Sequence, residues 1–415
     1  MWKLSHTTQA DSPAKYELAQ RSFKLMKARK ELGFFALPER SELWTTSEAR
    51  ARELRKTSHT LVVLGMGGSS LGGRAVMQSM KKWNETHHVE FLENVDSERF
   101  WSWLKSRTNL QDTHWVIVSK SGNTIETLSM AEFIDQHLRH SGFKKLSASS
   151  TVISENDDNP LMRWARKEGV AALEIPKDVG GRYSVLTPVG LLPAAYYGLD
   201  LENLKVGARW ALDQEELVVR LTTQLLMSFD RAEWITMFWS YADGLRDFGA
   251  WAQQLWAESL GKAKTREGAS PAPRASTPVP AIGSSDQHSI LQQVMEGFHD
   301  KFMFFLRVNQ SEGVGTPNDT TLEKNLFDCQ TIMLGRTMGQ LFGAEATATA
   351  SALEKQGVQS LTLTADRLDE RSMGAIFMLL ELVVGTIGEA LGINAFDQPG
   401  VELGKKLARE ILARP

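Results

Sequence analysis

Cysteine is nearly absent from the sequence, since Cys329 is the only one among 415 residues. No disulfide bond can therefore form within the chain, and a reducing compartment fits this composition. A long apolar run is absent as well. The longest apolar stretch, 373–388, is interrupted by Glu381 and is too short to span a bilayer. We expect this stretch to form a buried helix, and we expect no membrane partner.

The sequence also lacks a large excess of charge. Its 47 basic and 50 acidic residues give a net charge of −3, and no dense run of Lys and Arg with interleaved aromatic residues occurs. A nucleic-acid partner is therefore not expected. No group of His, Cys and Asp has the spacing of metal ligands, so no metal is expected either. The first thirty residues are rich in charge and do not resemble a secretory signal, which favours the cytoplasm.

Strand and helix patterns alternate from residue 60 onward. Short apolar runs that are typical of buried strands are separated by helical patterns. The expected strands are 60–64, 89–92, 115–118, 150–153 and 172–175, and the expected helices between them are 71–82, 98–105, 124–140 and 160–167. Such alternation predicts a parallel sheet with helices on both faces.

A second alternating region follows a helical connector at 189–234. Its expected strands are 234–241, 279–282, 302–308 and 360–364, and its expected helices are 244–260, 287–296, 325–354, 371–391 and 400–412. Between them, 262–280 is rich in Ala, Pro, Ser and Thr and is expected to be a long loop. We therefore predict an α/β fold with two domains and mostly parallel sheets. Its parts are a helical N-terminal arm (1–46), a first domain (47–188), and a second domain with connecting and C-terminal helices (189–415).

The segment 60–73 passes from a strand through glycines into a helix. Three glycines between 65 and 68 allow backbone N–H groups to approach an anion, and the helix N-terminus favours negative charge. One interpretation is a dinucleotide site, with Glu93 as the acid that binds a ribose. Ser70 then stands where the dinucleotide fingerprint requires glycine. A turn without a ligand is an equal alternative, so this segment alone does not identify the anion.

A second loop, 119–124, also lies between a strand and a helix N-terminus. Ser119, Ser121 and Thr124 can converge on one small anion together with backbone N–H groups. Adjacent parallel strands would bring this loop next to Ser69, at the edge where α/β sheets bind ligands. Hydroxyl groups around one anion suit a terminal phosphate better than a bridging pyrophosphate. Helix capping by Ser119 and Thr124 is the alternative, and it accounts for one hydroxyl well and for three poorly.

Two further motifs supply an arginine and a carboxylate. Arg182 follows two glycines in a tight turn, where its permanent charge can hold a developing oxyanion. The alternative for Arg182 is a surface ion pair with Asp178. Glu258 lies four residues after Gln254 on the same helix face, among apolar neighbours that can tune its proton affinity for general-base work. A solvated glutamate near a helix end is the commoner alternative for Glu258.

His288 and Lys405 are the remaining candidates. His288 lies at a strand-to-helix turn and is the best acid/base candidate of the nine histidines. Capping or packing at that turn is an equal alternative. Lys405 lies at the start of the last helix, where an exposed lysine is the default interpretation.

Together these motifs resemble the phosphoglucose isomerase family, whose fold consists of two sugar-isomerase (SIS) α/β domains with helical arms. The resemblance extends from Thr60 to Lys405, with the motifs in the family's order: VLGMGGSSLG, VSKSGNTIET, DVGGRYS, QLWAESLGK, GSSDQH and FDQPGVELGK. It implies reversible isomerisation of glucose 6-phosphate and fructose 6-phosphate by ring opening and proton transfer through a cis-enediolate. It also implies three-layer αβα domains, a sugar-phosphate substrate and no cofactor.

The resemblance implies roles for single residues as well. Glu258 matches the base that moves the proton between C1 and C2, and Arg182 matches the group that stabilises the enediolate. His288 and Lys405 match the pair that opens the sugar ring. The positions that match substrate-binding residues are Gly68, Ser69, Ser119, Lys120, Ser121, Thr124, Gln254 and Gln398. In the family the histidine reaches the site of the neighbouring subunit, so a homodimer is expected.

Two stretches depart from the family pattern. Gly122 and Asn123 stand where many members have an aromatic residue and Thr, and Pro399 stands where many have Trp. These departures bear on the geometry of the phosphate site and of the closing loop, and they remove no predicted catalytic residue. A non-catalytic sugar-phosphate sensor with the same fold is the alternative function. Such a protein could lose Glu258 and Arg182, and both are present.

Overall fold

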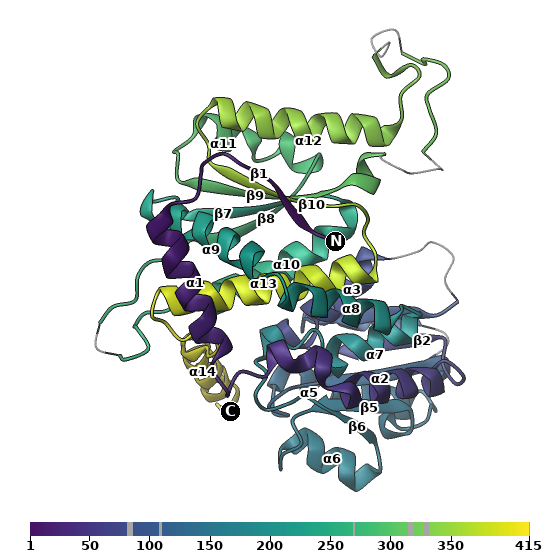
Figure 1. Ribbon diagram of the computed structural model, residues 1–415. Coiled ribbons are helices and arrows are strands. Elements are labelled where there is room, and N and C mark those ends of the chain that lie inside the picture. The colour runs from purple at the N-terminus through teal and green to yellow at the C-terminus, as the bar shows by residue number, and fades with distance from the viewer. Residues whose placement is uncertain (81–85, 108–109, 269, 314–318, 328–331, 415) are drawn as a thin grey trace.

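Two five-stranded sheets organise the computed structural model, which describes residues 1–80, 86–107, 110–268, 270–313, 319–327 and 332–414 (Figure 1). The first sheet has the order β3-β2-β4-β5-β6, and all its strands are parallel: β2 (Thr60–Leu64), β3 (His88–Leu92), β4 (Thr113–Val118), β5 (Ser150–Ser154) and β6 (Ala171–Glu174). The second sheet has the order β1-β10-β9-β7-β8, and it contains β7 (Ile235–Tyr241), β8 (Thr277–Ile282), β9 (Lys301–Val308) and β10 (Ser360–Ala365) as parallel strands. The predicted α/β fold with mostly parallel sheets is confirmed.

Alternate strand residues face opposite sides of the first sheet. Leu61 and Val63 of β2 belong to the core shared with α2 (Ser41–Leu54), α3 (Leu71–Ser79) and α7 (Pro188–Tyr197). Val62 and Leu64 belong to a separate core under α4 (Ser97–Lys105), α5 (Ile125–His140) and α6 (Pro160–Glu168). Because both faces of β2 and β4 are buried, these two strands are nearly continuous apolar runs, and this pattern made them recognisable in the sequence.

The second sheet is also covered on both faces. Met237 and Trp239 of β7 pack in the core under α11 (Leu291–Glu296) and α12 (Met338–Lys355). Phe238 faces the other side, where its ring centroid lies 5.5 Å from that of Trp256 on α10 (Arg246–Leu260). The helices on that side are α9 (Glu215–Asp230) and α13 (Glu370–Ala390), and α13 also packs on α1 (Pro13–Lys27) and α8 (Leu201–Leu212). Figure 1 shows α13 between the two sheets, so one continuous core joins them.

Within the described residues, α13 is the one helix long and apolar enough to cross a membrane. Its most apolar window is 89% buried inside the protein. The expectation that 373–388 forms a buried helix is therefore confirmed.

Glu381 is a buried acid in the middle of α13. Its side chain is fully buried, and neither carboxylate oxygen has a hydrogen-bond partner among the described residues. Burial raises the pKa of Glu381 well above its usual value because the charged form has no compensating partner. The folded protein therefore keeps this proton at pH values where the unfolded chain has lost it, and stability falls as the pH rises above the range of an unfolded glutamate.

We expect Glu381→Gln to stabilise the protein at high pH but not at low pH. Glutamine has the shape of the protonated acid and never loses a proton, so it removes the stability loss that accompanies ionisation. Each unit of raised pKa corresponds to about 1.4 kcal/mol at pH values above the folded-state pKa. The melting temperature of the variant should exceed that of the wild type by a few degrees at pH 8, and the two should agree near pH 4. An equal difference in melting temperature at both pH values would contradict the claim that Glu381 is protonated in the folded protein.

The first 46 residues are not wholly helical, so that prediction was wrong in part. Residues Lys3–Thr7 form β1, which pairs antiparallel with β10 at the edge of the second sheet. The partner strand lies more than 350 residues away, and no local pattern reveals such a pairing. The predicted helix start is confirmed, with Ser12 at the N-cap and Pro13 in the first turn of α1. The helix ends at Lys27, before Gly33.

Two predicted helices in the second half begin later than expected. In 325–354 the helix α12 starts only at Met338, after a capping box between Thr337 and Gln340. In 287–296 a 3₁₀ turn, Ser285–His288, precedes α11. Cys329 lies outside the described residues.

Candidate active site

The two predicted phosphate loops begin side by side. β2 pairs in parallel with β4, and Leu64 at the end of β2 lies opposite Ile117 near the end of β4. The loops 65–70 and 119–124 therefore leave the same edge of the sheet, and each leads into a helix N-terminus, that of α3 and that of α5. This edge is where parallel sheets bind ligands, because the backbone N–H groups of both helices point toward it.

Hydroxyl groups gather in the second loop. The Oγ of Ser119 lies 2.8 Å from the Oγ1 of Thr124. Thr124 occupies the N-cap of α5, but its side chain caps no backbone N–H, so capping does not explain its hydroxyl. Ser121 instead donates to Asn123 at 2.7 Å, and Lys120 forms an ion pair with Glu155 at 3.2 Å. The hydroxyl of Ser69 in the first loop makes no hydrogen bond to the described residues.

Glycine at position 68 joins the first loop to the turn that carries Arg182. A Cβ atom at Gly68 would lie 2.5 Å from the carbonyl oxygen of Gly181 and 2.8 Å from the backbone nitrogen of Arg182. Ser184 donates to the carbonyl of Gly68 at 3.3 Å. Only a residue without a side chain allows this approach, so the first loop and Arg182 belong to one site.

Arg182 is the centre of a buried hydrogen-bond network. Its side chain is 1% exposed, and its three nitrogens reach groups from two other segments. Nη1 donates to Glu258 at 3.2 Å and to the side chain of Gln398 at 2.8 Å. The remaining partners are Ser259 Oγ (2.7 Å), the carbonyl of Ala395 (2.6 Å) and the carbonyl of Asp397 (2.9 Å). Asp178 pairs with Arg40 instead, so the surface-pair alternative for Arg182 does not hold.

Glu258 is held by two side chains. Its Oε2 accepts from Arg182, and its Oε1 accepts from Nε2 of Gln254 at 3.0 Å. The Glu258 side chain is 29% exposed, so it is neither freely solvated nor sealed from a substrate. A Cβ atom at Gly67 would lie 2.8 Å from Nε2 of Gln254, which ties the first loop to α10 as well. The structure thus brings together the first loop, Arg182, Gln254, Glu258 and Gln398.

The sequence did not single out two buried residues that orient Arg182. Ser259 is fully buried and lies between Nε of Arg182 and the hydroxyl of Tyr183, at 2.7 Å and 3.1 Å. Burial raises the pKa of Tyr183 to about 12, so its hydroxyl stays protonated and available as a donor. Both residues lie inside motifs that the sequence did highlight, next to Arg182 and Glu258. The sequence pattern marks Arg182 and Glu258 but not these two residues, because a single hydroxyl group next to a charged residue has no distinctive spacing.

Lys262 is a third residue that the sequence did not single out. Its Nζ donates to the carbonyl of Glu258 at 2.7 Å and to the carbonyl of Asp397, and it forms an ion pair with Asp397 Oδ1 at 3.0 Å. Burial lowers the pKa of Lys262, and the charge of Arg182 acts in the same direction, whereas Asp397 opposes them. A cation therefore connects α10 to the segment that carries Gln398.

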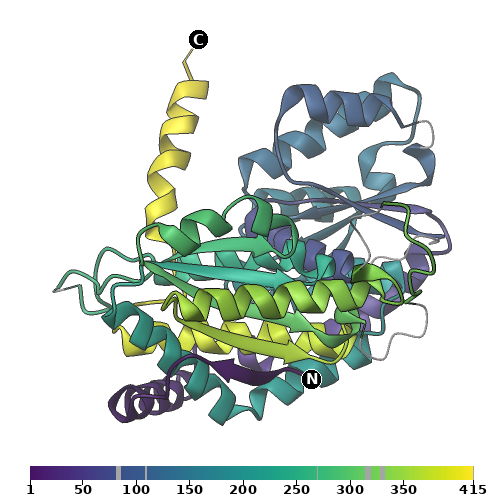
Figure 2. The same ribbon diagram turned by 90° about the horizontal axis from the view of Figure 1, so that it is seen from above.

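The structure does not bring His288 and Lys405 to the Arg182–Glu258 cluster. His288 is exposed and has no hydrogen-bond or ion-pair partner in the described part of the chain. Lys405 lies on α14 (Glu402–Leu412), is exposed, and forms an ion pair with Glu402 at 2.8 Å. Figure 2 shows α14 projecting away from the rest of the protein, and no residue of this helix is buried.

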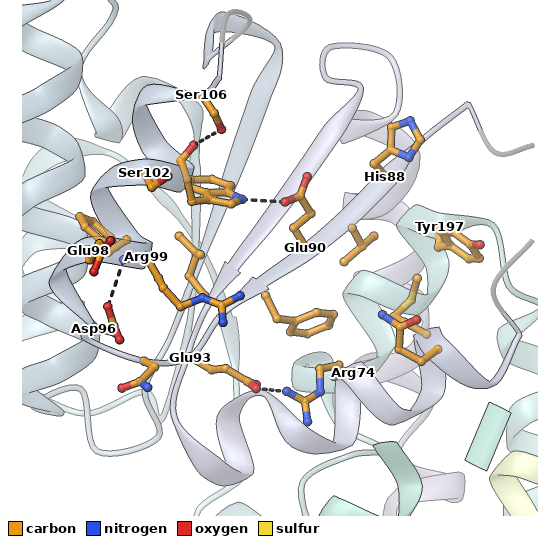
Figure 3. A pocket seen from close by; sticks show the side chains of 18 residues that line it. Arg74, His88, Glu90, Glu93, Asp96, Glu98, Arg99, Ser102, Ser106 and Tyr197 are labelled. Atoms are coloured by element: carbon orange, nitrogen blue, oxygen red, sulfur yellow. Dashed lines mark hydrogen bonds and ion pairs between the residues drawn. The ribbon is translucent and has the colours of Figure 1, made fainter. Parts of the chain in front are cut away.

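A separate groove of about 1170 Å³ lies along the outer edge of β3, between α3 and α4 (Figure 3). Arg182 and Glu258 do not line it. Glu93, the proposed ribose-binding acid of the dinucleotide interpretation, points at Arg74, and the two form an ion pair. Arg74 also reaches Asp247 on α10 at 3.2 Å. A carboxylate that is engaged in this way favours the phosphate interpretation of the first loop over the dinucleotide one.

No group of three or more His, Cys, Asp or Glu residues among those described could hold a metal ion. The cluster instead offers one carboxylate, two cations and amide donors around an open edge with hydroxyl groups. That set suits proton transfer next to an oxyanion, with an anionic end of the substrate bound nearby.

The sequence matches the family model "Phosphoglucose isomerase" over residues 45–415. A glucose-6-phosphate isomerase from Carboxydothermus hydrogenoformans is 35% identical over 423 residues, which cover 96% of this chain and 89% of that protein. These similarities do not favour the non-catalytic sensor.

Solved structures agree in fold. A hypothetical protein from Thermus thermophilus has a TM-score of 0.85 at 32% identity and covers 96% of this chain and 95% of its own. A glucose-6-phosphate isomerase from Chlamydia trachomatis has a TM-score of 0.84 at 22% identity, over 99% of this chain and 88% of its own, which shows a shared fold.

Proposed function

The chain belongs to the phosphoglucose isomerase family, and we propose that Glu258 and Arg182 form the catalytic centre of its reaction. The protein catalyses the reversible interconversion of glucose 6-phosphate and fructose 6-phosphate, an aldose–ketose isomerisation. The observation that carries the assignment of the centre is the buried guanidinium of Arg182, 3.2 Å from the carboxylate of a partly exposed glutamate.

The chemistry of the reaction matches this pair. In the open-chain sugar, Glu258 removes the proton from C2 or C1 and returns it to the neighbouring carbon, so one carboxylate serves as base and then as acid. Negative charge develops on the oxygens of the enediolate while the proton is on Glu258. The guanidinium of Arg182 is fixed by its other partners and needs no reorganisation to stabilise that charge. Gln254 and Gln398 supply amide groups for the sugar hydroxyls.

The phosphate end of the substrate binds at the two loops in this proposal. The hydroxyls of Ser69, Ser119, Ser121 and Thr124 and the ammonium of Lys120 surround it, together with backbone N–H groups that include that of Gly68. Ser121 turns from Asn123 toward the phosphate when the substrate is present. The contacts of Gly67 and Gly68 with Gln254 and Arg182 support this arrangement, because they set the loops beside the reacting carbons.

Replacing the paired hydroxyls should weaken substrate binding more than turnover. We expect the double variant Ser119→Ala, Thr124→Val to raise KM by about 100-fold or more, because two hydrogen bonds to a charged group are lost and each contributes roughly 1.5–3 kcal/mol. The value of kcat should change by less than the KM. Steady-state kinetics in both directions measure the effect. Ser141→Ala, at the opposite end of α5, is the matched control and should behave as the wild type. An unchanged KM in the double variant would show that the phosphate does not bind at this loop.

Ring opening requires an acid and a base beyond Glu258, and we propose that His288 supplies one of them to a second copy of the chain. His288 is exposed and has no partner among the described residues. A residue that completes the site of a second copy is expected to look like this when one chain is considered alone. The apolar residues Leu403, Leu407 and Ile411 recur every four positions on α14 and are 66%, 47% and 64% exposed. A homodimer that covers this face would also hold Lys405, the other residue of the pair.

The cytoplasm is the compartment that we propose.

Mixed dimers test the sharing of His288 between subunits. We expect Glu258→Gln and His288→Ala to be nearly inactive alone. When the two chains are refolded together, half of the dimers contain one of each, and one of their two sites has both native residues. The mixture should regain about a quarter of the wild-type activity. Activity that stays at the level of the separate variants would mean that each subunit uses its own His288.

A further inference from the structure

We propose that Lys262 is a positioning residue that locks the segment carrying Gln398 onto the helix that carries Glu258. This inference rests on the proposed function, and it adds a residue that none of the predicted roles includes. Lys262 lies two residues after the end of α10, and its side chain turns back toward the site, where it is 7% exposed. A surface lysine that only solubilises a helix end would extend into water.

The contacts of Lys262 all lead to the site. Its Nζ accepts no bond and can donate three, and its partners among the described residues are oxygens of Glu258 and Asp397. The bond to the carbonyl of Glu258 satisfies one of the free carbonyls at the C-terminal end of α10. The bonds to Asp397 fix the backbone one residue before Gln398. The same ammonium thus sets the spacing between the proposed base and the amide that faces it.

Arg182 and Lys262 act on one backbone carbonyl. Nη2 of Arg182 donates to the carbonyl of Asp397 at 2.9 Å, and Nζ of Lys262 donates to the same oxygen. Two buried cations beside each other repel, and the carboxylate of Asp397 lies against Lys262 at 3.0 Å to offset this. Asp397 is in turn held by the amide of Asn394 at 2.8 Å. An ordinary loop end does not need this many bonds. A proton transfer does need its groups held in a fixed geometry, and these bonds provide that.

The arrangement predicts which part of the substrate depends on Lys262. Gln398 and Arg182 face the reacting end of the sugar in the proposed mechanism, whereas the loops after β2 and β4 hold the phosphate. Lys262 touches neither of these loops. Loss of its charge should therefore disturb the reacting end and leave the phosphate end intact.

The experiment compares Lys262→Met, Lys262→Arg and the control Lys264→Met in the full-length enzyme. Methionine keeps the length of the side chain and removes its charge, and Lys264 is exposed two residues further on. The measurements are kcat, KM, the inhibition constant of inorganic phosphate, the affinity for an open-chain phosphorylated sugar acid by calorimetry, and the melting temperature.

We expect Lys262→Met to lower kcat about 10- to 100-fold and to weaken binding of the sugar acid, with the phosphate constant unchanged within about twofold. Lys262→Arg should recover most of kcat because it keeps the charge, and Lys264→Met should behave as the wild type. Unchanged kcat in Lys262→Met would overturn the proposal. Equal losses in both affinities together with a lower melting temperature would also overturn it, since they indicate a merely structural role. Absence of turnover in the wild type would instead contradict the proposed function, and the two binding constants would still report on Lys262.

Discussion

Glu258→Gln is expected to lower kcat by about 10²–10⁴-fold, the contribution of a positioned acid/base group. Glutamine occupies the same volume. Its carbonyl can accept from Arg182, and its NH2 group can donate to the side-chain oxygen of Gln254 once the Gln254 amide turns over, so the site keeps its shape. It cannot accept a proton from carbon at neutral pH. The affinity for the substrate should stay within several-fold of the wild type, because Glu258 in the proposed mechanism acts on the reaction and not on the phosphate.

Two observations make this result specific. Exchange of the C2 proton with solvent, followed by NMR in deuterated water, should be lost in parallel with turnover if Glu258 is the proton carrier. Glu267→Gln, an exposed glutamate in the loop after α10, is the control and should exchange at the wild-type rate. Turnover of Glu258→Gln close to that of the wild type would show that another group is the base.

Arg182→Lys is expected to lower kcat by about 10²–10³-fold, the usual loss when one donor to a developing oxyanion is removed. Lysine keeps the positive charge but offers it from a single nitrogen, whereas the guanidinium reaches Glu258, Gln398, Ser259 and two backbone carbonyls at once. The planar fork, and not charge alone, fixes the group beside Glu258. The substitution therefore tests geometry.

The buried position of Arg182 requires a check on folding. Carbonyls of Ala395 and Asp397 lose a partner in the variant, and the melting temperature should fall by several degrees. Activity is therefore measured well below that temperature. Arg40→Lys, in the pair with Asp178 near the same turn, should leave kcat unchanged. If Arg182→Lys retained full kcat in the folded state, enediolate stabilisation would have to come from elsewhere.

The strands and most helices were predictable because each is recognisable over a few residues. Buried parallel strands such as 113–118 are continuous apolar runs, and the glycines at the ends of β2 mark the turn into α3. β1 was not predictable, because its five residues become a strand only through pairing with β10 at the other end of the chain. The late start of α12 depends on the capping box at Thr337, which was overlooked within a longer apolar pattern.

The residues of the candidate site were predictable one motif at a time, but their connections were not. Arg182 and Glu258 stood out as charged groups in unusual surroundings. The partners that hold them include the carbonyls of Ala395 and Asp397, and every residue has a carbonyl, so no sequence pattern marks these two. Lys262 derives its role from its bond to the carbonyl of Asp397, and Ser259 derives its role from its bond to Nε of Arg182. The roles of His288 and Lys405 stay predictions, because neither residue contacts Arg182 or Glu258 in the described part of the chain.

A structure of the protein with an open-chain phosphorylated sugar acid tests the central proposal most directly. The proposal predicts one bound molecule, with its phosphate between Ser69 and the loop 119–124 and its carboxylate against Arg182, beside Glu258. Binding of the phosphate in the groove along β3, or of the acid group away from Arg182 and Glu258, would contradict it.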